Sequence, residues 1–561
     1  MQSRTSFFNP GLSRNLLRRY WPIWAGWLII LLLALPSWLP SIPHGEADEG
    51  VRLSGSVCMF LSALAAMASA WAMYSFLYKN RSCHMINTLP LKRETVFFTA
   101  WLTGLAPLLL AELVTALLAA LIGLPNGRVS AGTLVYWFAL TALGALACYN
   151  FAVFCATLTG NTVLMPLVFL VLNFVIAVLY WAGQLLLDLT LYGYSAVFPD
   201  WVLALSPPVY LIRGVIDGFY SPEILKAVAV YAAVSLPFLA LGLVFYKRRQ
   251  METAGDAVAL PWLKPVFKYA FSFGFAILFG LLVFALTGAD SRLALLILLL
   301  IGLFIGYFCA MMLLKRTVRV FRGHWKGFGV SAAILLVLAL CVGFDLFDYE
   351  TRVPAAAEVK AVSVSGMYGT DGVRFEAPEN IEAAIALHEG CVALKGGQRY
   401  SAERLTIRYE LQNGRTVERA YDPDGELTQG VLKALMNTPE ARRSRVTMAG
   451  ELALDRIYMA ELSYVVESDG TTRSIELKPA EVMDLFENGI LPDAEAGRIE
   501  TVDHNDYGYP ETVDTVEIWV YVSLKGGPAN VTYLQADSTA SLAWLAQHYP
   551  AALEGLPADG V

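Results

Sequence analysis

The sequence predicts a polytopic α-helical membrane protein of about nine transmembrane helices, followed by an α+β extracytoplasmic domain. Three observations support this fold class. Of the 561 residues 56% are hydrophobic, and nine apolar stretches are long enough for the roughly 20 residues that a helix needs to cross a bilayer. Basic residues concentrate in every second connection between these stretches. From Glu350 onward the composition changes, with 18 Lys and Arg against 34 Asp and Glu, a net charge of −16.

The basic residues between the apolar stretches orient the predicted helices. The predicted spans lie at about 20–40, 53–78, 95–124, 133–158, 162–187, 225–246, 267–288, 293–314 and 327–347. With a cytoplasmic N-terminus, the inner segments carry 18 Lys and Arg and the outer connections before Glu350 carry five. We therefore expect a multi-pass protein of the plasma membrane whose odd number of spans places the C-terminal domain outside.

The chain divides into three predicted regions, and the third is built from strands and helices. They are a six-helix domain at 1–250, three additional helices at 251–349 and the acidic outer domain at 350–561. Strands are predicted at 359–366, 455–466 and 516–524, a hairpin at 405–421 with Asn413-Gly414 at its turn, and helices at 379–394, 427–437 and 538–549. The order of strand, hairpin and helix suggests two similar modules, around 358–437 and 455–548.

Several motifs of catalysis and cofactor binding are absent from the sequence. It contains no GxxxxGK[ST], HExxH, GxSxG or CxxC pattern, so it carries no P-loop for ATP. The run Asp503-His504-Asn505-Asp506-Tyr507-Gly508 is interpreted as a polar loop, because Tyr507 stands where a calcium loop requires an oxygen ligand. We expect no catalytic residue, no cofactor or metal site and no nucleic-acid partner for this chain.

Three polar residues lie inside predicted spans. Glu112 is near the middle of the third span, Asn150 is in the fourth and Asn173 in the fifth. Burying a carboxylate at such a depth costs about 3 kcal/mol, so it must be neutral, paired or functional. Two interpretations remain open: these residues line a transport pathway, or Glu112 makes an interhelical hydrogen bond with Asn150 or Asn173.

A compact basic segment, "NRSCHMINTLPLKRETVFF" at 80–98, separates the second and third spans. Its apolar residues Met85, Ile86, Leu89 and Leu91 alternate with polar ones, and Pro90 disfavours helix at Leu89. We predict a short amphipathic helix at the membrane interface that ends before the third span begins. The alternative is that Lys92 and Arg93 serve only to retain the loop inside the cell.

This segment carries a resemblance to a known family. "NTLPLKRETVFFTAWL" resembles the LP-x-x-R segment that follows the second span of type 2 ABC-transporter permeases, where it forms the coupling helix that docks into the ATPase subunit. The start "NLLRRYWPIWAGW" resembles the interfacial helix of that family, and "VFPDWVLALSPPVYLIRGV" resembles its outer re-entrant helices. The resemblance implies an ATPase-facing set of Asn87, Thr88, Leu89, Pro90, Lys92 and Arg93 and a helix break at Ser206, Pro207 and Pro208.

The resemblance covers about residues 1–250, and the remainder resembles the larger permeases of Gram-positive bacteria. It implies the membrane subunit of an ATP-driven exporter, working as a homodimer or with a related permease. ATP and Mg²⁺ would be bound by a separate cytosolic ATPase, so this chain is not itself an enzyme. Two other functions stay open: a membrane-anchored sensor of extracellular peptides or envelope stress, and an ion-coupled carrier using Glu112.

Overall fold

The structure is a computed structural model that forms two compact units. It describes residues 7–41, 47–125, 127–217, 222–288, 291–321, 323–346, 348–365, 373–394, 404–421, 426–466, 471–503, 518–525, 529–535 and 537–553. The first unit comprises Met1–Leu186 and Val197–Ala339, and the second comprises Leu187–Ala196 and Leu340–Val561.

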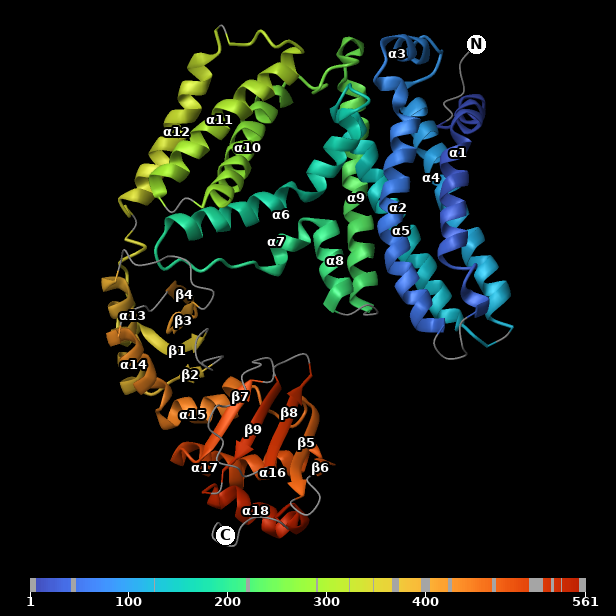
Figure 1. Ribbon diagram of the computed structural model, residues 1–561. Helices are drawn as coiled ribbons and strands as arrows, with labels where there is room; N and C mark the ends of the chain where they lie inside the picture. Colours follow the sequence, from blue (N-terminus) through green and yellow to red (C-terminus); the bar gives the residue numbers. More distant parts are fainter. Residues whose placement is uncertain are drawn as a thin grey trace. The chain divides into compact units, whose positions relative to one another are not determined.

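Within the described residues, nine helices are long and apolar enough to cross a membrane, as the sequence predicts (Figure 1). They are α1 (Pro10–Ala34), α2 (Ala47–Met73), α4 (Arg93–Gly123), α5 (Ala131–Leu158), α6 (Leu164–Thr190), α9 (Pro222–Arg248), α10 (Leu263–Thr287), α11 (Arg292–Lys315) and α12 (Trp325–Gly343). Many apolar side chains on these helices face outward, with Leu121 72% and Leu286 77% exposed. Such a surface is compatible with a multi-pass protein whose solvent is lipid.

The first helix departs from the predicted boundaries. The expected start near residue 20 is wrong, because α1 begins at Pro10, where the side chain of Asn9 accepts a hydrogen bond from the Leu12 amide at 2.9 Å. The residues that resemble an interfacial helix, 15–27, lie inside this single continuous helix. Its N-terminal end packs on α4, where the Ser13 and Thr103 hydroxyls are 2.9 Å apart.

The helices of the first unit pack in a small number of close pairs. α2 lies along α5, α5 along α9 and α1 along α4, while α10 and α11 form an antiparallel hairpin. Glycines allow the closest approach in that hairpin, since a Cβ on Gly302 would lie 3.0 Å from the backbone of Ala276. Three short helices accompany the long ones: α3 (Asn80–Asn87), α7 (Asp200–Ala204) and α8 (Pro207–Asp217).

The second unit begins with a module built on a four-stranded antiparallel sheet of order β2-β1-β3-β4. Its elements are β1 (Val359–Ser365), β2 (Val373–Phe375), α13 (Pro378–Ala393), β3 (Leu405–Leu411), β4 (Thr416–Tyr421) and α14 (Glu426–Met436). The predicted hairpin is confirmed: Gly414 has φ 78° and the Asn413 side chain accepts from the Arg415 amide at 2.9 Å. The helices α13 and α14 cover one face of the sheet and bury its apolar residues.

The other module of this unit has a five-stranded antiparallel sheet of order β6-β5-β8-β9-β7. Its elements are β5 (Ile457–Val466), β6 (Thr471–Glu476), α16 (Pro479–Leu485), α17 (Leu491–Ala496), β7 (Ile499–Asp503), β8 (Ile518–Leu524), β9 (Ala529–Leu534) and α18 (Thr539–His548). Apart from β7, both modules place a hairpin, one or more helices, a second hairpin and a helix in the same order. The helix α15 (Pro439–Val446) connects them and contacts both β2 and α17.

Candidate functional site

The segment between the second and third long helices forms the predicted short helix and bend. In α3 the side chains of Cys83 and Ile86 are buried while Met85 is 58% exposed. The helix ends at Thr88, whose hydroxyl donates to the Met85 carbonyl at 2.8 Å, and α4 begins at Arg93. The prediction of a helix that ends before Pro90 is therefore confirmed. We call the residues between the two helices, 88–92, the LPLK turn.

The LPLK turn is exposed, whereas its neighbour Arg93 is bound to the rest of the unit. Thr88, Leu89, Pro90 and Lys92 are exposed. The guanidinium of Arg93 donates to the carbonyl of Lys247 at 2.7 Å and to that of Arg249 at 3.1 Å, and so satisfies carbonyls at the C-terminal end of α9. Of the predicted ATPase-facing set, Arg93 is thus directed to its own chain, and the side chain of Asn87 lies outside the described part of the structure.

A buried arginine, Arg249, lies close to Arg93. In the sequence it is only one member of a run of basic residues. Arg249 is 6% exposed, and its guanidinium donates to the carbonyl of Leu77 at 2.9 Å and to that of Thr159 at 2.8 Å. Leu77 follows α2, Thr159 follows α5 and Arg249 follows α9. The arginine therefore holds the ends of three long helices together. No sequence signal distinguishes it from Lys247 and Arg248 beside it.

Two of the predicted intramembrane polar residues bond to different neighbours. The Asn150 amide accepts from Trp101 Nε1 at 2.8 Å and donates to Ser235 Oγ at 2.9 Å, which ties α5 to α4 and α9. The Asn173 amide donates to the carbonyl of Phe169 in its own helix at 2.8 Å. The predicted hydrogen bond between Glu112 and Asn150 or Asn173 is therefore wrong, because each asparagine is satisfied elsewhere.

Glu112 is fully buried, and neither of its carboxyl oxygens has a hydrogen-bond partner among the described residues. Trp27 of α1 and Cys58 of α2 lie near it. The environment offers no compensating charge for a carboxylate. A carrier that uses Glu112 to bind an ion needs access from solvent, and the full burial of this residue does not favour that role.

The predicted helix break at Ser206, Pro207 and Pro208 is present. The helix α7 ends at Ala204, and α8 begins at Pro207, a position where the missing amide hydrogen of proline costs nothing. The buried hydroxyl of Ser206 donates to the carbonyl of Asn173 in α6 at 2.5 Å. The structure therefore brings these two predicted residues into contact. Placement of these short helices inside a membrane stays a prediction.

A second segment, residues 187–196, makes contacts that no sequence pattern indicates; it contains the end of α6 and belongs to the second unit. The Asp188 carboxylate pairs with Arg404 at 2.6 Å, and the Ser195 hydroxyl donates to Glu418 at 2.6 Å. Between them, the Tyr192 hydroxyl donates to the carbonyl of Cys391 at 2.9 Å. Within the second unit, these contacts join residues 187–196 to the first sheet module.

The centre of this contact is a buried aromatic cluster. The His388 imidazole is fully buried between the hydroxyls of Tyr409 and Tyr421, at 2.9 and 2.8 Å. Burial, together with the positive charge of Arg419, lowers the pKa of His388 to about 4. Gly193, at φ +73°, packs on the ring of Tyr421, where a Cβ would come within 2.5 Å of the ring.

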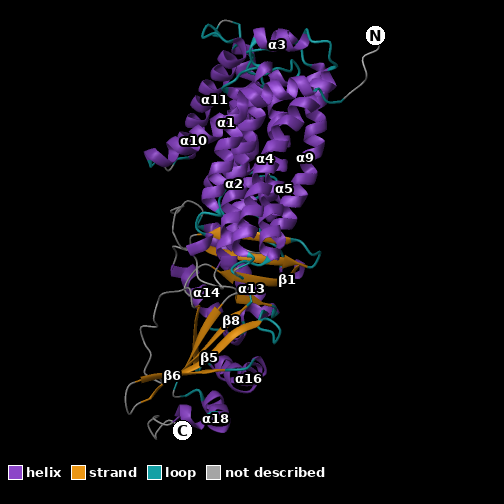
Figure 2. Ribbon diagram, turned by 90° about the vertical axis from the view of Figure 1, so that its right-hand side faces the viewer, coloured by secondary structure: helices purple, strands orange, loops and turns teal. Residues whose placement is uncertain are grey.

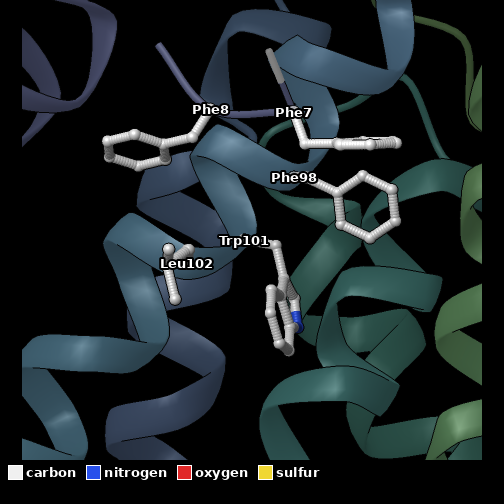
Figure 3. A pocket seen from close by; sticks show the side chains of 5 residues that line it. All are labelled: Phe7, Phe8, Phe98, Trp101 and Leu102. Atoms are coloured by element: carbon white, nitrogen blue, oxygen red, sulfur yellow. The ribbon is translucent and has the colours of Figure 1, made fainter. Parts of the chain in front are cut away.

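An apolar pocket of about 290 Å³ lies beside the start of α1 (Figure 3). Its lining consists of Phe7, Phe8, Phe98, Trp101 and Leu102, with the rings of Phe7 and Phe98 packed edge to face at 6.4 Å. None of these side chains carries a titratable group. The pocket therefore suits an apolar group, and its lining offers no acid, base or nucleophile for catalysis.

The chain matches no family model, no curated protein and no solved structure. Among the described residues, no group of three or more His, Cys, Asp or Glu side chains is arranged to hold a metal ion.

Proposed function

We propose that this chain is the membrane-spanning permease subunit of an ATP-driven ABC transporter, an exporter that works with a separate cytosolic ATPase. The observation that carries the proposal is the LPLK turn, in which Leu89, Pro90 and Lys92 are exposed while the helices on both sides are held in place. A turn of this kind offers apolar Leu89 and Pro90 beside the charge of Lys92, the chemistry of a small docking surface for a protein.

The surroundings of the turn would carry a displacement into the helix bundle. Arg93 bonds the start of α4 to the end of α9, and Arg249 bonds the same end to the segments after α2 and α5. A partner that shifts the turn would therefore shift four long helices together. Rigid-body movements of packed helices are the usual basis of alternating access in transporters.

In this proposal ATP and Mg²⁺ are bound by the partner, and two permease chains form the path for the substrate. The chain itself has no P-loop sequence. The exposed apolar faces of α6 and α9, including Leu167, Leu170 and Val230, supply surface for lipid or for the second permease chain. The proposed location is the plasma membrane, with the LPLK turn in the cytosol and the second unit outside.

A sensor function is the second candidate, and the 187–196 segment favours it. The contacts of Asp188, Tyr192 and Ser195 join the end of α6 to the first sheet module. A ligand bound by the outer domain could thus bias the position of a membrane helix. The two functions are compatible in one protein, because the same connection would let an exporter respond to its surroundings.

The proposal is tested by co-purification with any P-loop ATPase whose gene neighbours that of this chain. We expect a stable complex that is lost when Leu89→Ala, Pro90→Ala and Lys92→Glu are combined. Arg93 is left intact, because its replacement would also release α9. The control, Val318→Ala with Lys326→Glu, changes exposed residues of another connection predicted to face the cytosol. Transport driven by an ion gradient without any ATPase would instead support a carrier.

A further inference from the structure

One face of the five-stranded sheet carries a set of side chains that the proposed transport function does not use. Along β8 the residues alternate, with Ile518, Val520, Val522 and Leu524 buried and Trp519, Tyr521 and Ser523 half-buried. The buried set packs with residues of α16 and α18, which lie on the same side of the strands (Figure 2). We call the opposite side, which carries Trp519 and Tyr521, the aromatic face.

The register of the strands places aromatic rings and carboxylates side by side on this face. Trp519 lies opposite Tyr533 of β9, with ring centres 6.5 Å apart. Tyr521 lies opposite Glu461 of β5, and Glu461 in turn lies opposite Glu476 of β6. The face is therefore aromatic at β8 and β9 and acidic at β5 and β6.

Within the described part of the structure, Glu461 and Glu476 have no base as an ion-pair partner. Like charges directly opposite on neighbouring strands destabilise a sheet. Among the ion pairs of the described residues, none involves Glu461 or Glu476, although several pairs form elsewhere in the second unit. A bound cation would relieve this repulsion.

The four-stranded sheet of the first module provides an internal comparison. Its uncovered face also carries glutamates, but each has a base: Glu410 pairs with Arg374 at 3.1 Å and Glu418 with Arg408 at 4.0 Å. Uncompensated acids are thus not a general property of these two modules. The aromatic face alone combines them with three large rings.

We infer that the aromatic face binds a cationic peptide with aromatic or aliphatic side chains. Lysine or arginine side chains of the peptide would pair with Glu461 and Glu476, and its apolar side chains would pack on Trp519, Tyr521 and Tyr533. Cations over aromatic rings add to such binding. The net charge of −16 on residues 350–561 attracts a cationic peptide to the face.

The probe is a fluorescein-labelled peptide of six Lys-Trp repeats, and the protein is the full chain in phosphatidylcholine nanodiscs. Binding is measured by fluorescence anisotropy, after subtraction of the signal from empty nanodiscs. We expect the Lys-Trp peptide to bind, dodecalysine to bind more weakly and six Glu-Trp repeats not to bind. Equal affinity for dodecalysine and the Lys-Trp peptide would overturn the role of the aromatic rings.

Matched variants separate the site from the general acidity of the domain. We expect Glu461→Gln with Glu476→Gln to weaken binding about fivefold to tenfold, from two lost charge contacts. The control, Glu379→Gln with Glu382→Gln, removes the same charge from exposed positions of α13 and should leave the affinity unchanged. Equal weakening by both double variants, or no binding by the wild-type chain, would overturn the inference.

Two single variants of Trp519 test how much its aromatic ring contributes to the affinity, with the charge of the protein unchanged. Trp519→Ala should weaken binding about threefold to tenfold, and Trp519→Phe should retain most of it. If Trp519→Ala does not fold, the Phe variant and the glutamine variants still decide the outcome. The inference does not depend on the ATPase, so complex formation with that subunit should be unaffected by Glu461→Gln with Glu476→Gln.

Discussion

Two segments that adjoin long helices of this protein differ in how their side chains are satisfied. In the LPLK turn Leu89 is 39% exposed, and Pro90 and Lys92 are exposed as well. In the 187–196 segment the residues Asp188, Tyr192 and Ser195 each bond to the first module of the second unit. The side chains of the first segment are therefore largely exposed, and those of the second are bonded within the chain.

This difference leads to opposite expectations for substitutions. Changes in the 187–196 segment remove contacts that the folded chain already makes, so they should lower stability. Changes in the LPLK turn remove few such contacts, so they should leave the stability nearly unchanged and affect only the association with a partner. The predictions below run from the largest effect on stability to the smallest.

Gly193→Ala is expected to cost about 4 kcal/mol of the stability of the first module. The new Cβ would overlap the Tyr421 ring, and alanine is strained at φ +73°. Hydrogen exchange of the β3 and β4 amides, measured by mass spectrometry, should show lost protection. Gly390→Ala of α13 is the control, since no atom lies within 4 Å of the added group, and it should not lower protection. Unchanged protection in Gly193→Ala would refute the packing described for this segment.

Acidification should destabilise the same module by up to about 3 kcal/mol between pH 6.5 and pH 4. The pKa of His388 is lowered to about 4 by burial and Arg419, while the unfolded chain binds the proton near pH 6.5. The stability is therefore complete above pH 6.5 and is lost as the pH falls toward 4.

The measurement for this pH effect is hydrogen exchange, corrected for the intrinsic rate at each pH. The neighbouring Tyr409, Tyr421 and Cys391 have pKa values raised by burial, so they stay uncharged across this range. Glu389 lies near Tyr409 and is present in both the wild type and the variant. His388→Gln, which does not titrate, should flatten the pH dependence, and an identical profile in both chains would contradict the assignment to His388.

Asp188→Asn should cost about 1 kcal/mol, because the pair with Arg404 is only partly exposed and its charge is lost. The exposed pair of Arg443 and Glu495, 3.5 Å apart, is the control, and Glu495→Gln should change the stability by less than about 0.5 kcal/mol. Thermal unfolding of the two purified variants compares these values. Equal shifts would show that the Asp188 pair behaves as an ordinary surface pair.

Leu89→Ala with Pro90→Ala and Lys92→Glu should change the stability by less than about 0.5 kcal/mol, the usual range for exposed substitutions. Thermal unfolding of the isolated permease measures this. A large loss of stability would mean that the turn is part of the folded core, and the contrast with the 187–196 segment would fail.

The long helices and several strands were predictable because their signals are local. A helix that crosses lipid requires about 20 apolar residues in a row. In a strand with one buried face, buried and more exposed residues alternate, as they do from Ile518 to Leu524. The start of α1 was misplaced because the apolar run was used, whereas Asn9-Pro10 is the actual capping signal. The three-residue strand β2 is too short to show any period.

The candidate site was only partly predictable, because its contacts join distant parts of the chain. The exposed turn could be found from Leu89, Pro90 and Lys92, which lie together in the sequence. The bonds of Arg93 to the end of α9 span more than 150 residues, and those of Tyr192 to the first module span a similar distance. Neither pair leaves a local pattern, so only the fold reveals them.

The most direct test of the proposed transport function is photo-crosslinking from the LPLK turn. Benzoylphenylalanine replaces Leu89 in one chain and Val318 in a control chain, each produced together with any P-loop ATPase whose gene neighbours that of this chain. We predict an ATPase crosslink from position 89 whose yield changes when ATP binds, and little crosslinking from position 318. A crosslink from position 318 without one from position 89, or no ATPase crosslink from either, would contradict the proposal that this turn is the docking site of an ATPase.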